Sequence, residues 1–200
     1  MKNILISILR DKNSPRDKFQ EAAHKLSFIL ATEVSNYLPT KQINIETPMS
    51  TTQGVKLPQE IMIVIILRSA IAMLKPFLTY YPQASIGVIG LKRNEFTAKP
   101  EQYYCNLPPI TPQQSIILID PMLATGGSAS FAIDLILKAG AQESQIFYSG
   151  IIGSKEGTQY LKEKYPKIKQ IIAQIDPVLN DKKYIIPGLG DFGDRYFGTE

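Results

Sequence analysis

Seven consecutive apolar residues, IMIVIIL at positions 61–67, constrain the fold of this chain more than any other feature. A strand with one solvated face alternates apolar and polar side chains, whereas an uninterrupted apolar run of this length is typical of a strand covered on both faces. The run SIILI at 115–119 has the same character. The sequence therefore predicts a buried sheet with helices on both of its faces.

Strand and helix patterns alternate along the rest of the chain. Strand patterns recur at 84–91, 144–152 and 168–175, and helical patterns lie at 71–79, 127–139 and 158–165. Such alternation favours right-handed crossovers and a mostly parallel sheet, with ligands at the carboxyl ends of its strands. We therefore predict an α/β fold and, because no long linker divides the chain, a single domain over residues 1–200.

Two further elements are predicted before the first apolar run. Ser14, Pro15 and Asp17 form a helix start with Ser14 as the cap, and apolar residues then recur at helical spacing until Pro39. QINIET at 42–47 alternates as a half-buried strand does. The opening apolar run is too short for a signal peptide, and no run reaches the ~18 apolar residues of a membrane span. We expect a cytoplasmic protein.

Composition and charge narrow the function classes only a little. Lys and Arg number 22 against 18 Asp and Glu, and this net charge of +4 is weak support for nucleic-acid binding. The densest basic stretch, 162–169, is best interpreted as a solvated helix face. Cys105 is the only cysteine, so no intrachain disulfide forms and its thiol has no expected role. His24 is the only histidine, which excludes a histidine metal cluster and favours a structural or surface role.

The stretch DPMLATGGS at 120–128 follows the second buried run directly. Asp120 stands where this strand ends, an unfavourable place for a carboxylate without a partner. The two glycines let a ligand approach the backbone, and Thr125 and Ser128 offer hydroxyls beside the free N–H groups of the next helix, a geometry that binds phosphate. The alternative is a tight turn in which Asp120 and Ser128 only cap the helix. The residues alone leave these two interpretations equal.

Two arginines lie where other strands end. Arg68 follows the first apolar run at once, and its planar guanidinium matches phosphate oxygens, although by frequency alone a surface ion pair is the commoner explanation. Arg93 stands at the root of residues 92–113, a segment too long for a routine connection. That segment is either a mobile flap that closes Arg93 over an anionic ligand or a segment with a small hairpin.

The tail YIIPGLGDFGDRYFGT at 184–199 combines four glycines and a proline with Tyr and Phe. Its apolar and aromatic content indicates that it packs rather than remaining disordered. One interpretation is a strap over the core. The other is a loop whose main-chain groups read a flat ligand.

Together and in this order, these four stretches resemble the uracil phosphoribosyltransferase family, a type I phosphoribosyltransferase family. VIILRSA resembles its ILRAG loop, KRNEFTAKPEQYYCNLP its flap, IDPMLATGGS its phosphoribosyl diphosphate loop and YIIPGLGDFGDRYFGT its uracil-binding tail. The similarity covers most of residues 14–200. It implies a phosphoribosyltransferase-like fold with a flexible flap at 92–113 and a C-terminal base-binding hood at 176–200.

The resemblance also implies a reaction and its participants. The phosphoribosyl group of 5-phospho-α-D-ribose 1-diphosphate would pass to uracil, giving UMP and diphosphate in pyrimidine salvage. Mg²⁺ would arrive on the sugar substrate and lie near Asp191 without a direct protein ligand, and GTP is a candidate activator. The expected assembly is a homodimer or homotetramer, and neither nucleic acid nor membrane is an expected partner.

Site residues carry over from the family one by one. Arg68, Arg93 and Asp191 are the implied catalytic residues: the two arginines would bind the diphosphate, and Asp191 the ribose or its metal shell. Asp120 would face the ribose hydroxyls. The remaining residues of the phosphoribosyl diphosphate site would be Pro121, Met122, Leu123, Ala124, Thr125, Gly126, Gly127 and Ser128.

The family resemblance places uracil against backbone groups at Ile185, Gly190 and Phe192, beside Asp191. A backbone N–H, C=O, N–H arrangement matches the carbonyl, N3–H and carbonyl edge of uracil, whereas the cytosine amine would face a donor. A different class of function is a weakly active or non-catalytic nucleotide-binding regulator, motivated by Ala70, where the family has glycine, and by the altered N-terminus. An RNA-binding attenuator and a transferase for another base are remoter hypotheses.

Overall fold

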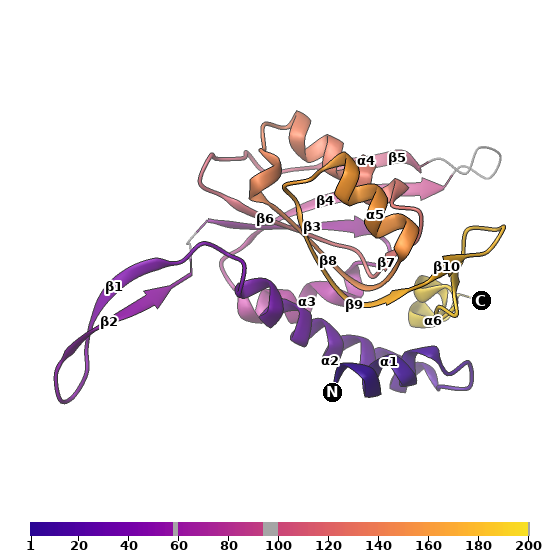
Figure 1. Cartoon of the computed structure of the whole chain (residues 1–200), viewed down its shortest axis with the longest axis horizontal. Helices are drawn as coiled ribbons and strands as arrows, with labels where there is room; N and C mark the ends of the chain where they lie inside the picture. Colours follow the sequence, from indigo (N-terminus) through magenta and orange to yellow (C-terminus); the bar gives the residue numbers. More distant parts are fainter. Residues whose placement is uncertain (58–59, 94–99, 200) are drawn as a thin grey trace.

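The computed structural model describes residues 1–57, 60–93 and 100–199, without the side chain of Arg93 (Figure 1). The elements in chain order are α1 (Lys2–Arg10), α2 (Arg16–Ser35), β1 (Lys41–Glu46), β2 (Thr51–Lys56), β3 (Ile61–Leu67), α3 (Ile71–Tyr80), β4 (Ser85–Arg93), β5 (Pro100–Asn106), β6 (Ser115–Ile119), β7 (Met122–Leu123), α4 (Gly127–Lys138), the 3₁₀ turn η1 (Glu143–Gln145), β8 (Ile146–Ser154), α5 (Lys155–Lys164), β9 (Lys169–Asp176), β10 (Val178–Leu179), β11 (Ile185–Ile186) and α6 (Phe192–Phe197).

The central sheet has the strand order β5-β4-β3-β6-β8-β7, with β9 on β8. β3 pairs in parallel with both β4 and β6, and β8 pairs in parallel with β6, β7 and β9, whereas β4 and β5 are antiparallel. Every residue of β6 and β8 is buried. The predicted mostly parallel sheet is confirmed.

Helices cover both faces of this sheet, as the continuous apolar strands predict (Figure 1). Successive residues of β3 enter different cores: Ile63 and Ile65 pack with α1, α2 and α3, whereas Met62 and Val64 pack with α4 and α5. Both faces of this strand are therefore dry. Within the described residues, no helix is long and apolar enough to cross a membrane.

The N-terminal segment differs from the expectation in two respects. Helix α1 was not predicted, yet it buries Leu5, Ile6 and Leu9. Helix α2 is confirmed, but the predicted cap is wrong, since Pro15 occupies the N-cap position. The Ser14 hydroxyl instead donates to the carbonyl oxygen of Ile8 at 2.6 Å and so joins the two helices.

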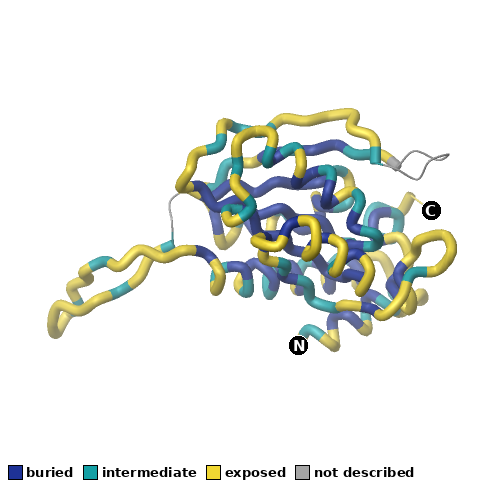
Figure 2. The backbone as a smooth tube through the Cα atoms, turned by 45° about the horizontal axis from the view of Figure 1, so that its top comes forward, coloured by how far each residue is buried: buried dark blue, intermediate teal, exposed yellow. Residues whose placement is uncertain are grey.

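The strand at 42–47 exists, but its predicted half-burial is wrong. β1 pairs antiparallel with β2, and most residues of this hairpin are exposed. The hairpin extends away from the body of the protein (Figures 1 and 2). Its apolar side chains Ile45, Met49 and Val55 are exposed. They therefore do not pack into the core described for the rest of the chain.

Residues 92–113 contain the small hairpin that the sequence left as an alternative. β4 and β5 pair antiparallel from Val88 opposite Asn106 to Arg93 opposite Pro100. Residues 94–99 and the Arg93 side chain lie outside the described part of the chain. A flap function for this segment stays a prediction, as does the division of the chain into one domain with a base-binding hood at 176–200.

Candidate active site

The loop after β6, residues 120–128, bends sharply into α4. Gly126 is the N-cap of that helix, in the left-handed region at φ 82°, and no side chain caps it. The Thr125 hydroxyl accepts the Gly127 N–H at 3.3 Å, and Ser128 is exposed. The alternative in which Asp120 and Ser128 cap the helix is therefore wrong. The first turn of α4 presents N–H groups and hydroxyls to the same edge of the sheet.

Helix α5 holds this loop from behind. The buried Ser154 hydroxyl donates to the Ala124 carbonyl oxygen at 2.5 Å and accepts the Gly157 N–H at 2.8 Å. A Cβ at Gly157 would lie 2.3 Å from that same carbonyl oxygen, and a Cβ at Gly126 would lie 2.8 Å from the Tyr160 ring. Sequence reasoning missed this support, because the helix was predicted to begin at 158, whereas α5 begins at Lys155 with Ser154 as its N-cap.

Asp120 is 7% exposed at the end of β6. Its Oδ1 accepts a hydrogen bond from the Ser69 hydroxyl at 3.2 Å. Burial is the largest influence and raises its pKa to about 7, although the bonds from Ser69 and the Met122 N–H oppose that shift. A buried carboxyl group of this kind is suited to hydroxyl donors.

The turn between β3 and α3 joins the loop to the C-terminal tail. Ser69 touches Asp120, whereas Arg68 points toward α6, where its Nη2 lies 3.4 Å from Asp194 Oδ1 and donates to Thr199 Oγ1 at 3.2 Å. The Arg68 guanidinium is also 5.2 Å from the Phe197 ring centroid. The side chain remains 54% exposed, so these contacts are weak and replaceable by an anion.

Ala70 follows in this turn, at the position where the family has glycine. Its φ is −66°, an ordinary value for a residue with a side chain. The residue is fully buried in the core that α1, α2 and α3 share. The Ala70 methyl group therefore packs into that core, and glycine is not required here.

The tail reaches the same turn. Asp191 is the N-cap of α6, and its Oδ1 accepts the Asp194 N–H at 3.0 Å. A Cβ at Gly193 would lie 3.3 Å from Asp191 Oδ1 and 4.0 Å from Ser69 Cβ, which places the start of α6 against the β3–α3 turn. Asp191 is exposed at this junction.

The residues assigned to uracil divide between core and surface. Ile185 is buried in β11, whereas Gly190 is exposed with φ 81°. The Phe192 side chain is fully buried, with its ring centroid 5.3 Å from Phe19 and 5.7 Å from Tyr196. The Phe192 side chain therefore belongs to the core and does not line a ligand site.

The structure brings Asp120, Arg68 and Asp191 into one neighbourhood around Ser69. It adds the flap root, since a Cβ at Gly127 would lie 3.9 Å from Pro100 Cδ. The Arg93 side chain lies outside the described residues. Whether these residues bind substrate stays a prediction.

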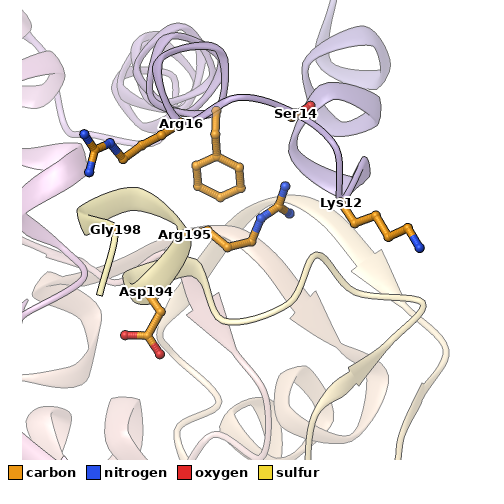
Figure 3. Close-up of a pocket in the computed structure, with 7 residues that line it drawn as sticks. Lys12, Ser14, Arg16, Asp194, Arg195 and Gly198 are labelled. Carbon is orange, nitrogen blue, oxygen red and sulfur yellow. The ribbon is translucent and has the colours of Figure 1, made fainter. Parts of the chain in front are cut away.

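A cavity of about 420 Å³ lies between the tail and the N-terminal helices (Figure 3). Its lining is rich in cationic side chains and consists of Lys12, Ser14, Arg16, Phe19, Asp194, Arg195 and Gly198. Two of these seven residues, Lys12 and Ser14, lie in the connection between α1 and α2. The cavity adjoins the candidate site through α6, because Asp194 lines the cavity and also contacts Arg68.

A mostly parallel sheet with a phosphate-type loop after a central strand and a tail folded over the strand ends defines a phosphoribosyltransferase-type fold. A purine phosphoribosyltransferase from Pyrococcus horikoshii shares the fold at a TM-score of 0.51 and 14% identity, over 78% of this chain and 87% of that one. A solved structure from Aquifex aeolicus, of the protein AQ2163, is similar at a TM-score of 0.89 and 31% identity, covering 100% of this chain and 95% of that chain.

The family model for uracil phosphoribosyltransferase matches residues 2–199. The curated uracil phosphoribosyltransferase of Clostridium perfringens strain SM101 is 42% identical over 196 residues, which are 98% of this chain and 93% of that protein. The chain belongs to the uracil phosphoribosyltransferase family.

Proposed function

We propose that this protein transfers the phosphoribosyl group of 5-phospho-α-D-ribose 1-diphosphate to uracil, giving UMP and diphosphate. The observation that carries the proposal is the meeting of two segments at Ser69, whose hydroxyl bonds Asp120 while its Cβ faces Gly193 of the tail. A phosphate-type loop and a base-reading tail at one point are what a transfer between sugar phosphate and base requires. Family membership supports the same reaction.

The phosphate loop would hold the sugar phosphate. Main-chain N–H groups and hydroxyls from Ala124 to Ser128 face the start of α4, where the helix dipole favours an anion. Asp120 would accept hydrogen bonds from the ribose hydroxyls. Arg68 would exchange its exposed contacts with α6 for the diphosphate, with Arg93 approaching from the flap.

Leaving-group departure sets the electrostatic demand on the site. As the bond from the sugar to diphosphate breaks, positive charge develops on the sugar and negative charge on the leaving group, so fixed cations near the diphosphate lower the barrier. Asp191 would stabilise the positive charge on the sugar; this role is supported by its exposed carboxylate at the junction of tail and turn. No covalent nucleophile is needed.

Mg²⁺ fits this arrangement as a companion of the substrate. Carboxylate, phosphate and water oxygens are its preferred ligands, and the exposed Asp191 carboxylate is a donor of that type. The ion would neutralise charge on the diphosphate when bound.

We also propose that GTP activates the enzyme. Adding GTP to the UMP assay tests this proposal, and an unchanged rate at limiting substrate would contradict activation.

Uracil would be read by the main chain at Ile185, Gly190 and Phe192. The buried Phe192 side chain fixes the backbone without entering the base site, and the positive φ of Gly190 turns the chain toward Asp191. A backbone donor cannot satisfy the cytosine amine, so an unpaired buried group would penalise that base. A panel of free bases should therefore show strong preference for uracil.

The test is UMP formation from uracil, the sugar diphosphate and Mg²⁺. We expect turnover, with no product from cytosine. Folded protein that binds neither substrate and makes no UMP would contradict the proposal. The alternative of a non-catalytic regulator loses one of its two motives, because Ala70 fits its position without strain, and it is not favoured by the family match.

A homo-oligomer is part of the proposal. A two-stranded hairpin is marginally stable alone in water, and the β1–β2 hairpin carries exposed Ile45, Met49 and Val55 away from the body (Figure 1). Packing against a second copy would cover them. Light scattering after size exclusion should show a dimer or tetramer that an Ile45→Ser, Val55→Ser variant weakens; a monomer at micromolar concentration would contradict this.

A cytoplasmic location, suited to the exposed Cys105 thiol, is also part of the proposal and is tested by cell fractionation.

A further inference from the structure

A partly buried ion pair connects the N-terminal helix α1 to the end of β9, directly before the C-terminal region. Arg10 of α1 donates from Nη2 to Asp176 Oδ1 at 2.6 Å and from Nη1 to Asp176 Oδ2 at 2.9 Å. The Asp176 side chain is 2% exposed and that of Arg10 is 24% exposed. This bidentate geometry uses the planar fork of arginine, which lysine lacks.

The same pair holds both backbone groups of Gly188. The Gly188 N–H donates to Asp176 Oδ2 at 2.8 Å, and the Gly188 carbonyl oxygen accepts from Arg10 Nη1 at 3.1 Å. Gly188 has φ 61°, and a Cβ there would lie 2.1 Å from the Ile185 carbonyl oxygen. Its orientation is therefore set by two charged side chains and a close backbone approach.

A second arginine repeats the pattern one residue later. Arg195 of α6 donates to the Leu189 carbonyl oxygen at 2.6 Å and to the carbonyl oxygens of Leu9 and Asp11 at the end of α1, the latter at 2.6 Å. Its guanidinium lies 4.4 Å from the Phe19 ring centroid, beside the cavity of Figure 3. Consecutive carbonyls of the tail are thus tied to α1.

Gly188 and Leu189 lie between the main-chain groups assigned to uracil, at Ile185 on one side and Gly190 on the other. We propose that Arg10 and Asp176 are positioning residues for base recognition: by fixing both backbone groups of Gly188, they aim the main chain of the tail at uracil. This inference rests on the proposed function. It assigns to the N-terminal helix a part in base selectivity, although α1 supplies none of the assigned substrate-binding residues.

The test uses Arg10→Lys, which keeps the charge and removes the fork. We expect KM for uracil to rise about tenfold, because one charge-assisted hydrogen bond of the type lost corresponds to roughly that factor. KM for the sugar diphosphate should stay within about twofold. Asp176→Asn should shift KM for uracil in the same direction and serves as the second variant if Arg10→Lys folds poorly.

Lys2→Met is the matched control. Lys2 lies on the same helix and pairs with Glu33 of α2 at 2.8 Å, with both side chains about one third exposed. Lys2→Met removes a positive charge from α1, a larger change of charge than Arg10→Lys makes, but it leaves the contacts of Gly188 untouched, so both KM values should be unchanged. A fall in kcat with an unchanged KM for uracil in both Arg10→Lys and Asp176→Asn would overturn the proposal and leave the pair a structural one.

Amide hydrogen exchange provides a readout that needs no activity. In Arg10→Lys the Gly188 and Leu189 amides should exchange at least about tenfold faster than in Lys2→Met, with the α2 amides unchanged. Unaltered exchange at Gly188 would overturn the positioning role. If the wild-type protein made no UMP, the proposed function would fail, and the exchange result would still decide whether the pair fixes this backbone.

Discussion

The phosphate loop at 120–128 and the tail at 184–199 are both irregular backbone at one edge of the sheet, but different parts of the chain hold them. The loop rests on α5, where Ser154 bonds Ala124 from 30 positions away. The tail rests on α1, where Arg10 bonds the Gly188 carbonyl oxygen from 178 positions away. One segment is supported by its next strand and helix, and the other by the opposite end of the chain.

The chemistry of the two supports also differs. Glycines without room for a Cβ and hydrogen bonds from hydroxyl groups hold the loop, whereas charged side chains bonded to carbonyls hold the tail. Substitutions that add side-chain volume should therefore displace the loop. The tail should instead be displaced by substitutions that remove its charged hydrogen bonds, and by acid. The following substitutions test this difference, beginning with the largest expected effect.

Asp120→Asn should lower UMP synthesis about 100-fold, because the carboxylate assigned to the ribose hydroxyls loses its charge. The same change should stabilise the free protein at pH 8. Burial raises the pKa of Asp120 to about 7, so its protonated form is favoured by folding; the associated stability is present below about pH 4 and is lost as the pH rises through 7.

Thermal melts of the wild type and Asp120→Asn measure this trade. The variant should melt about 2–4 °C higher at pH 8, with little difference near pH 4. A variant that melts lower at both pH values would instead make Asp120 a structural carboxylate of the loop.

Gly157→Ala should lower kcat/KM for the sugar diphosphate about 30-fold while KM for uracil changes little. The added Cβ would meet the Ala124 carbonyl oxygen at 2.3 Å and push the phosphate loop out of position. Steady-state kinetics with each substrate varied checks the split.

Gly140→Ala is the control for Gly157→Ala. Gly140 has φ 107° with nothing within 4 Å of an added Cβ, so it should cost about 1 kcal/mol of stability and leave kinetics unchanged. Equal kinetic losses in both variants would refute a specific steric role for Gly157.

Much of the fold was predictable from local pattern. The buried runs of β3 and β6 determine the sheet, because continuous apolar strands require cover on both faces. The predicted half-burial of β1 was wrong, because alternating apolar and polar residues indicate that one face of a strand is covered but do not show whether this chain or another molecule covers it. Helix α1 was not predicted because it is short and has neither a side-chain N-cap nor an acidic residue in its first turn, although Leu5 and Leu9 have helical spacing.

The parts of the candidate site that form contiguous motifs were likewise predictable, whereas contacts between distant residues were not. Asp120 and the glycines after it form a contiguous motif, and the family resemblance supplied Arg68 and Asp191. Pattern could not reveal that Arg10 reaches Asp176, because a contact between distant residues leaves no periodicity in either segment. The Phe192 side chain was also unpredictable in direction, since an aromatic beside glycines fits a ligand pocket and a core equally well.

Asp191→Asn separates electrostatic from structural roles in the tail. Asn caps helices as well as Asp, so the Asp194 N–H keeps its acceptor and the melting temperature should change by less than about 2 °C. Turnover should fall about tenfold if the carboxylate stabilises charge on the sugar. Asp191→Ala should lose about 1 kcal/mol in addition, and a large loss of stability in Asp191→Asn would favour a purely structural carboxylate.

The smallest expected effect is the response of the tail to acid. Burial alone would raise the pKa of Asp176, but the Arg10 hydrogen bonds and the Gly188 N–H outweigh it and hold the pKa below its ordinary value. The stability from this charge is therefore present above about pH 4 and is lost as the pH falls through the lower folded pKa. The melting difference between wild type and Asp176→Asn should shrink by about 2–4 °C between pH 6 and pH 3. A difference that grows over that range would mean that burial, not Arg10, dominates Asp176, and that the tail is held by packing in the way that the phosphate loop is.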